Sequence, residues 1–176
     1  MTFPHQPAYV PTLIGEGFEG SGNSAAHVKV VLGDRNGPVG AAWTTALATP
    51  SVGHAPFLVV ARPGLPVKPL TLFVNTATIT GDDHATLTWG AAQAGVAAGV
   101  IEAVRQGRIP VPFAEAGLLI ASVWVDPGAG LAHQDAINTN NRVATVAALE
   151  AMATGSPTVD EVMSDQEGIW NAHYTP

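Results

Sequence analysis

The chain has 176 residues and no cysteine, and its 14 acidic and 7 basic side chains give a formal net charge of −7. The acidic balance and the lack of a basic stripe argue against nucleic acid or an anionic membrane as a partner. Without cysteine there is no disulfide, no thiolate nucleophile and no cysteine-ligated zinc. Charged residues make up only 12% of the chain, so we expect a homo-oligomer that buries part of a weakly polar surface.

The length is typical of one domain. Closely spaced prolines predict that residues 1–12 form an extended N-terminal arm. Residues 13–155 carry the periodic pattern of a single domain, and the polar residues 156–176 are expected to form a C-terminal tail. The first residues lack the cationic and apolar regions of a signal peptide, and no run of about 20 apolar residues is available to span a bilayer. We therefore expect a cytoplasmic protein with no membrane partner.

Two strands are predicted near the N-terminus, over residues 13–18 and 26–32. Alternation in the second strand places Val28 on one face with its aliphatic neighbours, and His27 and Lys29 on the other face. The segment before it contains glycines at positions 15, 17, 20 and 22, which predict tight or positive-φ turns. A phosphate-binding loop is not favoured, because the required lysine and serine and an immediately following helix are missing.

The rest of the chain alternates between helices and strands. Helices are predicted over residues 39–49, 88–107 and 136–154, and strands over residues 56–61, 70–79 and 117–125. Residues 80–84 are expected to turn, and residues 109–115 to form a loop or short linker. The order β-β-α-β-β-α-β-α predicts an α+β fold, with one mostly antiparallel sheet and helices packed on one face.

His27 and Lys29 are the side chains on this strand with the most useful chemistry. An imidazole can donate or accept a proton near neutral pH. An ammonium can hold an anion or, when deprotonated, form a carbinolamine with an aldehyde. Both residues are equally typical of solvated strand positions with no chemical task, so the spacing alone leaves these alternatives open.

Other polar residues give weaker indications. Asp82, Asp83 and His84 are consecutive, and consecutive side chains rarely converge on one ion, so we predict a turn or helix cap and no metal site. His54 and His133 stand alone in the sequence. Gln93, on a predicted helix, could hydrogen-bond a heterocycle or be an ordinary polar helix position.

Three segments of the chain together resemble the formaldehyde-activating enzyme family. They read GEGFEGSGNSAAHVKVVLG, LPVKPLTLFVNTATI and WGAAQAGVAAGVIEAVRQGRIP, and they lie within residues 14–110. Beyond Asp126 the similarity is confined to the long helix and the Gly-Ser-Pro sequence after it. The resemblance therefore covers well over half of the chain.

The resemblance implies a fold like the second domain of ribosomal protein S5, assembled as a homopentamer with sites between subunits. It implies a lyase of one-carbon metabolism: formaldehyde condenses with tetrahydromethanopterin, forming carbon–nitrogen bonds in the methylene derivative and releasing water. Tetrahydromethanopterin is then a co-substrate, and no tightly bound cofactor is implied. His27 takes the position of the proton donor, and Leu58, Thr78 and Gln93 take pterin-contacting positions.

Three positions depart from the family pattern. The family has an aspartate where this chain has Lys29, a lysine where it has Thr76, and a histidine where it has Ala94. We count Lys29 and Thr76 among the substrate-binding positions. An ammonium would hinder a developing iminium cation that a carboxylate would help. If positions 29 and 76 lie on neighbouring strands, Lys29 could replace the lost lysine, while Asp126, Asp135 or another acid could return the carboxylate.

Three hypotheses follow from the resemblance and these departures. The first is a carbon–nitrogen condensing enzyme that joins formaldehyde, or a similar small carbonyl, to tetrahydromethanopterin or a related amine carrier. The second is a non-catalytic pentamer that binds or senses a pterin or another small molecule. The third is an enzyme that acts on another carbonyl through a carbinolamine on Lys29.

Overall fold

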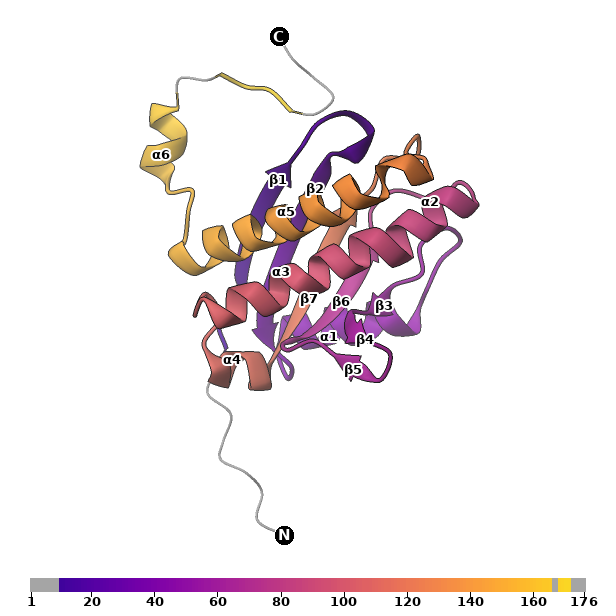
Figure 1. The fold of residues 1–176 in the computed structure, drawn as a ribbon. Helices are drawn as coiled ribbons and strands as arrows, with labels where there is room; N and C mark the ends of the chain where they lie inside the picture. Colours follow the sequence, from indigo (N-terminus) through magenta and orange to yellow (C-terminus); the bar gives the residue numbers. More distant parts are fainter. Residues whose placement is uncertain (1–9, 166–167, 172–176) are drawn as a thin grey trace.

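The computed structural model describes residues 10–165 and 168–171 of the chain. Its centre is a five-stranded sheet in the order β1-β2-β7-β6-β3 (Figure 1). The strands are β1 (Leu13–Glu19), β2 (Ala26–Asp34), β3 (Phe57–Leu58), β6 (Leu70–Asn75) and β7 (Gly117–Trp124). Neighbouring strands are antiparallel except β6 and β7, which are parallel. The fold is therefore α+β with a mixed sheet, and most strand pairings are antiparallel as predicted.

The helices account for most of the remaining described residues. They are α1 (Pro38–Ala48), α2 (Asp82–Thr86), α3 (Gln93–Arg105), α4 (Val111–Ala116), α5 (Gln134–Thr154) and α6 (Val159–Ser164). A π-helical turn over Leu87–Ala92 joins α2 and α3 into one continuous segment, and short 3-10 turns cover Gly22–Ser24 and Leu131–His133. A separate two-stranded ribbon consists of β4 (Val60–Arg62) and β5 (Leu65–Pro66).

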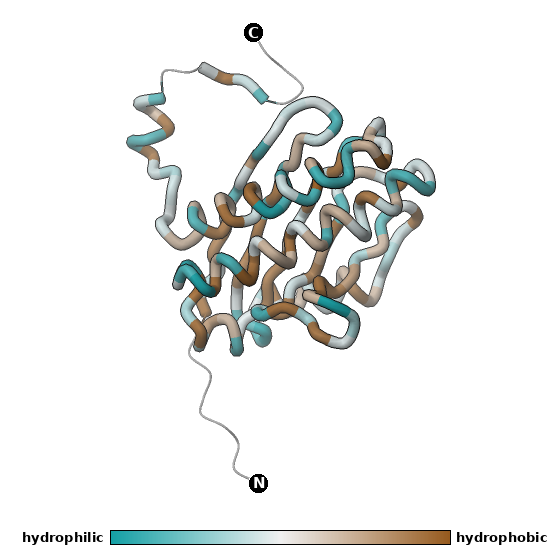
Figure 2. Tube along the Cα trace, in the orientation of Figure 1, coloured by the Kyte–Doolittle hydropathy of each residue, from teal (hydrophilic) through white to brown (hydrophobic). Residues whose placement is uncertain are grey.

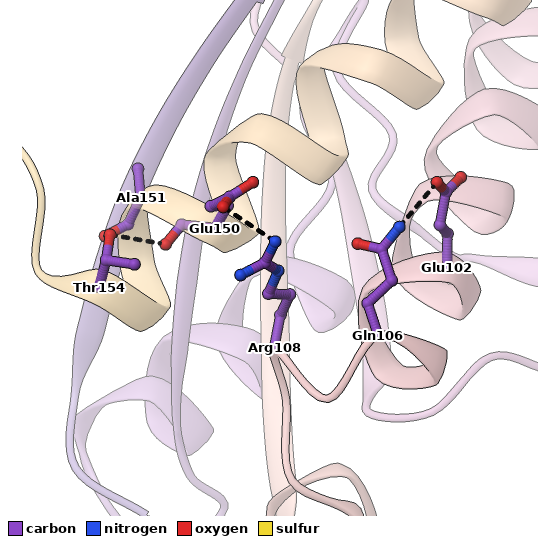
Figure 3. Close-up of polar contacts among 6 residues, drawn as sticks. All are labelled: Glu102, Gln106, Arg108, Glu150, Ala151 and Thr154. Atoms are coloured by element: carbon purple, nitrogen blue, oxygen red, sulfur yellow. Dashed lines mark hydrogen bonds and ion pairs between the residues drawn. The ribbon is translucent and has the colours of Figure 1, made fainter.

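The hydrophobic core lies between the sheet and the pair α3 and α5, which run side by side across one face (Figure 1). Alternation along β2 supplies this face, because Val28, Val30 and Leu32 are all buried. Polar contacts fasten the helix pair at its outer surface: Arg108 Nη2 lies 2.9 Å from Glu150 Oε1 (Figure 3), and Arg142 Nε lies 2.8 Å from Glu102 Oε2. Such exposed ion pairs add little stability, so apolar burial holds the layers together.

Glycine lets α5 approach the sheet closely. A Cβ added to Gly15 would lie 2.0 Å from the carbonyl oxygen of Ala148, and one added to Gly17 would lie 2.2 Å from that of Ala144. The prediction of a turn at these two positions was therefore wrong, because both lie inside β1 and serve helix packing. Gly20 and Gly22 do adopt positive φ, at 81° and 56°, as the turn prediction requires.

One helix lies on the other face of the sheet. Gly33 shares the face of His27 and Lys29 by strand alternation, and a Cβ there would lie 2.5 Å from Cγ2 of Val39 in α1. The expectation that all helices pack on one face was therefore wrong for α1. The consequence is that α1 covers the second face beside Gly33 and leaves it open towards His27.

The predicted elements are present with altered boundaries. The predicted strand over residues 56–61 is split between β3 and β4, and the next strand ends at Asn75 rather than at residue 79. The predicted turn at residues 80–84 already begins helix α2, and the predicted loop over residues 109–115 contains α4. The left-handed Gly155, with φ 72°, ends α5 as predicted.

The terminal segments are only partly described. Of the predicted arm, residues 1–9 lie outside the described residues, whereas Val10 is buried in the core. Of the predicted tail, residues 166–167 and 172–176 lie outside them, and α6 with residues 168–171 lies within them. The division of the chain into an arm, a domain and a tail stays a prediction.

The continuous segment Asp82–Arg105 is long and apolar enough, by composition alone, to cross a membrane. Its most apolar window is 56% buried inside the protein, and α3 packs against both α5 and β4. Figure 2 shows apolar positions along the strands beneath these helices. A core helix buried in this way meets the same length and hydropathy test, so its composition follows from packing.

Candidate functional site

A cleft of about 590 Å³ lies over the strand positions of β1 and β2 that face away from α3 and α5. Alternation brings the side chains of Glu16 and Phe18 on β1 to this face together with His27 and Lys29 on β2. The cleft is lined by Glu16, Phe18, His27, Lys29, Thr76, Trp124, Trp170 and Asn171. We refer to this set as the β2 cleft.

His27 is paired with a carboxylate in the β2 cleft. Its Nε2 lies 2.6 Å from Glu16 Oε1. A carboxylate only accepts hydrogen bonds, so a proton carried by Nε2 would be directed at Glu16. The side chains are 35% and 57% exposed, respectively, so both reach the solvent of the cleft. A protonated imidazole held in this way is a suitable proton donor, and the carboxylate stabilises its charge.

The same carboxylate lies across the strands from Lys29. Glu16 and Lys29 are direct partners in the β1–β2 register, whereas Phe18 is opposite His27. Glu16 turns its carboxylate to the imidazole, and Lys29, which is exposed, has no hydrogen bond or ion pair within the described part of the chain. The prediction that His27 and Lys29 share one wall is confirmed, and the carboxylate of Glu16 lies at the imidazole rather than at the ammonium.

Aromatic side chains surround the imidazole. The Phe18 ring meets the His27 ring edge to face, with centroids 6.2 Å apart, and Trp170 meets Phe18 in the same manner at 6.4 Å. Trp124 is the register partner of His27 on β7. Figure 1 shows residues 168–171, beyond α6, running towards the β1–β2 turn. The cleft therefore has apolar walls from three separate parts of the chain.

Thr76 lies in the β2 cleft, but not on a strand next to β2. Its backbone N–H and its hydroxyl both donate to the carbonyl of Val123, at 2.8 and 3.1 Å. Strand β7 therefore separates Thr76, just after β6, from Lys29 on β2. The hypothesis that positions 29 and 76 lie on neighbouring strands was wrong, although both side chains line the same cleft.

The three predicted pterin-contacting residues lie elsewhere in the protomer. Leu58 is on β3, the far edge of the sheet from β1. The Thr78 hydroxyl lies 3.1 Å from His54 Nε2. Gln93, only 8% exposed, accepts from the N–H of Val60 at 3.1 Å and donates to its carbonyl at 3.2 Å. None of the three lines the β2 cleft, so the predicted site residues form two separate groups within one protomer.

The remaining polar candidates have structural partners. Asp82 and Asp83 occupy the first turn of α2, where carboxylates favour the positive end of a helix. His84 is 2% exposed, donates from Nε2 to the carbonyl of Val125 and accepts at Nδ1 from the N–H of Thr80. Among the residues that the structure describes, no group of three or more histidine or acidic side chains could hold a metal ion.

Glu16 is the site residue that the sequence reasoning missed. The sequence left open whether Asp126, Asp135 or another acid returns the carboxylate to the pocket. Asp126 accepts from the N–H of Gly128 and lines a neighbouring cavity that shares Phe18 and Trp124 with the β2 cleft, and Asp135 lies in the first turn of α5. The alternation used for β2 would have found Glu16 if it had been applied to β1. Trp170 gave no such signal, because the predicted tail carried no periodic pattern.

A family model described as formaldehyde-activating enzyme (Fae) matches residues 14–174 of the chain. The chain belongs to the formaldehyde-activating enzyme family. A member from Methanosarcina barkeri, named 5,6,7,8-tetrahydromethanopterin hydro-lyase, is 37% identical over 156 residues, which cover 89% of this chain and 86% of that protein. The resemblance found in the sequence is thereby confirmed.

Longer relatives in the formaldehyde-activating enzyme family carry the name bifunctional enzyme Fae/Hps. The protein from Methanococcoides burtonii is 41% identical over 155 residues, which cover 88% of this chain and 39% of that protein. The protein from Methanothrix thermoacetophila is 40% identical with the same coverage. The chain thus spans about two fifths of the length of these bifunctional relatives.

Proposed function

We propose that this family member condenses formaldehyde, or a similarly small carbonyl compound, with tetrahydromethanopterin or a related amine carrier and releases water, with His27 as the proton donor. The observation that carries the proposal is the His27–Glu16 contact of 2.6 Å on the floor of an aromatic-walled cleft, in a chain whose relative is named a tetrahydromethanopterin hydro-lyase. No metal or tightly bound cofactor is part of this proposal.

The chemistry needs an acid and a counter-charge. An amine nitrogen adds to the aldehyde carbon and gives a hemiaminal. The hydroxyl leaves as water after His27 protonates it, and an iminium cation forms. A second amine nitrogen of the carrier attacks this carbon and loses its proton, which restores the acid. General acid catalysis of this kind contributes roughly 10²- to 10⁴-fold.

Glu16 supplies the negative charge that the iminium requires. A carboxylate about 4 Å from a unit positive charge contributes roughly 4 kcal/mol at an effective dielectric constant of about 20, before solvent screening reduces it. Lys29 acts in the opposite direction, and Glu16 offsets it. Glu16 thus fills the role of the aspartate that the family resemblance assigned to position 29.

A homopentamer with the site between subunits fits this proposal. In one protomer, Leu58 on β3 is separated from His27 on β2 by three strand spacings, or about 14 Å. A neighbouring subunit placed over the β2 cleft could present its own Leu58 and Thr78. Exposed apolar side chains, such as Ile14 at 69% and Leu47 at 42%, offer surface for such contacts.

Stopped-flow measurement of formaldehyde consumption in the presence of tetrahydromethanopterin tests the proposal. The wild-type protein should exceed the spontaneous rate. His27→Ala should lose at least a hundredfold of this acceleration, whereas His133→Ala, which removes an imidazole outside the cleft, should retain it. Glu16→Gln should lose roughly tenfold or more, equivalent to about 1.4 kcal/mol. Wild-type protein that gives no acceleration would overturn the proposed catalysis.

A non-catalytic binding or sensing role is the second candidate. The exposed ammonium of Lys29 favours it, because a positive charge beside the developing iminium opposes turnover. This candidate predicts that tetrahydromethanopterin quenches tryptophan fluorescence in the wild-type protein and in His27→Ala alike, with no acceleration by either. Borohydride treatment with formaldehyde present examines the third hypothesis, since a carbinolamine-derived adduct on Lys29 would add mass to the peptide that contains it.

A further inference from the structure

The β2 cleft contains the ammonium of Lys29, and the carboxylate opposite it in the strand register is paired with another residue. Glu16 stands directly across from Lys29 in the strand register, but its carboxylate lies 2.6 Å from His27 Nε2. Ser122, the register partner of Lys29 on β7, is neutral. The other residues that line the cleft are neutral as well, apart from His27 when it is protonated. Among the described residues, Glu16 therefore carries the only carboxylate that lines the β2 cleft, and that carboxylate is paired with His27.

Lys29 differs in this respect from the other lysine of the chain. Lys68 Nζ lies 3.3 Å from Glu115 Oε2, an ordinary exposed ion pair. Lys29 points into a cleft with aromatic side chains, where Phe18, Trp124 and Trp170 exclude part of the solvent. An ammonium in such surroundings interacts more strongly with an anion than one in open water. The Lys29 ammonium is therefore available to an anion that enters the cleft.

We propose that Lys29 makes the β2 cleft selective for a carbonyl substrate that carries a carboxylate next to the reacting carbon, that is, a small 2-oxo acid. The inference rests on the proposed condensation and specifies its substrate class. His27 and Lys29 are two residues apart on one strand, about 6.5 Å along the backbone. An ammonium at this spacing can hold the carboxylate while the adjacent carbonyl carbon lies before the imidazole.

The bond changes balance without an added oxidant or reductant. The amine N–H adds across the C=O bond of the oxo acid and forms a carbinolamine that retains the carboxylate. His27 donates a proton to the hydroxyl, the C–O bond breaks and water leaves. The iminium carbon accepts the second amine nitrogen, whose proton returns to His27. The sum is a diamine plus an oxo acid giving a cyclic aminal carboxylate plus water.

Ligand binding in the absence of an amine carrier tests this proposal independently of turnover. The probes are glyoxylate and glycolaldehyde, two small aldehydes of which only the first carries a carboxylate. Binding is followed by tryptophan fluorescence at low and at high salt. We expect the wild-type protein to bind glyoxylate at least tenfold more tightly than glycolaldehyde, with the preference weakened by salt. Lys29→Gln should abolish the preference and Lys29→Asp should reverse it, whereas Lys68→Gln should keep it.

Two results would overturn the proposal. The first is equal binding of glyoxylate by the wild-type protein and Lys29→Gln. The second is a Lys29→Gln variant that loses affinity for tetrahydromethanopterin but keeps its affinity for glyoxylate. That result would mean that the ammonium binds an anionic group of the carrier. The thermal midpoints of the variants show whether each is folded. A failure of formaldehyde turnover with a preserved glyoxylate preference would reject the proposed function with formaldehyde and leave the anion selectivity standing.

Discussion

The two faces of the sheet use the same strands for opposite purposes. On the face towards α5, β1 presents Gly15 and Gly17, and the helix backbone rests almost directly on the strand. On the other face, one residue along, β1 presents Glu16 and Phe18 to the β2 cleft. The first face is defined by close contact, and the second by charge and open space. Substitutions on the first face should therefore change stability, and those on the second should change binding.

The largest effect is expected from Gly17→Ala. The added Cβ would meet the carbonyl oxygen of Ala144 at 2.2 Å, so α5 or β1 must shift. We expect a loss of about 3 kcal/mol in the free energy of unfolding, or roughly 10 °C in the thermal midpoint. Gly90→Ala is the control, because a Cβ there meets nothing within 4 Å. Equal midpoints for the two variants in a thermal scan would remove the packing role of Gly17.

Gln93→Leu separates a structural role from a ligand-binding role. Gln93 lies on the side of α3 that is buried, and both of its hydrogen bonds go to the backbone of Val60. Leaving these two backbone groups without partners should cost about 2 kcal/mol of stability. Gln106→Leu, an exposed change near the end of the same helix, should cost less than about 0.5 kcal/mol. Unchanged stability with weaker pterin binding would instead support the contact that the family resemblance implies.

Trp170→Ala should change ligand binding in the β2 cleft and leave stability unchanged. Trp170 is 52% exposed and contacts Phe18 in the wall of the β2 cleft. Losing this aromatic wall should weaken ligand binding about tenfold, equivalent to about 1.4 kcal/mol, without lowering the thermal midpoint. Trp89→Ala is a matched control, since Trp89 is 48% exposed and does not line the cleft. A fluorescence titration in which both variants bind alike would exclude Trp170 from the site.

The smallest expected effect concerns α6, the element that precedes the Trp170 segment. The N–H of Thr158 donates a hydrogen bond to the Glu161 carboxylate, and the Thr158 hydroxyl accepts one from the N–H of Glu161. Hydrogen bonding by the backbone and side chain of Thr158 lowers the pKa of Glu161 from its usual 4.5. Because the folded pKa is the lower one, ionised Glu161 stabilises α6 above pH 4.5, and this contribution disappears as the pH falls through the lowered value.

NMR chemical shifts of α6 should therefore move towards coil values in acid, while those of α5 stay constant. Glu161→Gln should lose this pH dependence because its amide does not titrate. Identical shifts for α6 at pH 6 and pH 3 in the wild-type protein would contradict the expected capping contribution.

The sequence predicted the cleft floor better than its walls. The period of two along a strand places His27 and Lys29 together without knowledge of any partner strand. The contact with Glu16 depends in addition on the register between β1 and β2, which a single strand pattern does not contain. Trp170 reaches the cleft from a segment distant in sequence, and no local pattern encodes such a contact. The structural role of Gln93 was not predictable from its helix pattern, because its partners are backbone atoms of Val60 in β4, more than 30 residues away.

The glycines of β1 also bear on how the protein could be redesigned. Because α5 packs closely against the backbone of β1 at Gly15 and Gly17, this helix determines the position of the strand that carries Glu16. A library intended to change ligand preference should therefore vary outward-facing positions such as Phe18, Lys29 and Thr76, and leave both glycines untouched. In such a library the backbones of β1 and α5 keep their positions, and new specificity comes from exchanging the side chains that line the cleft.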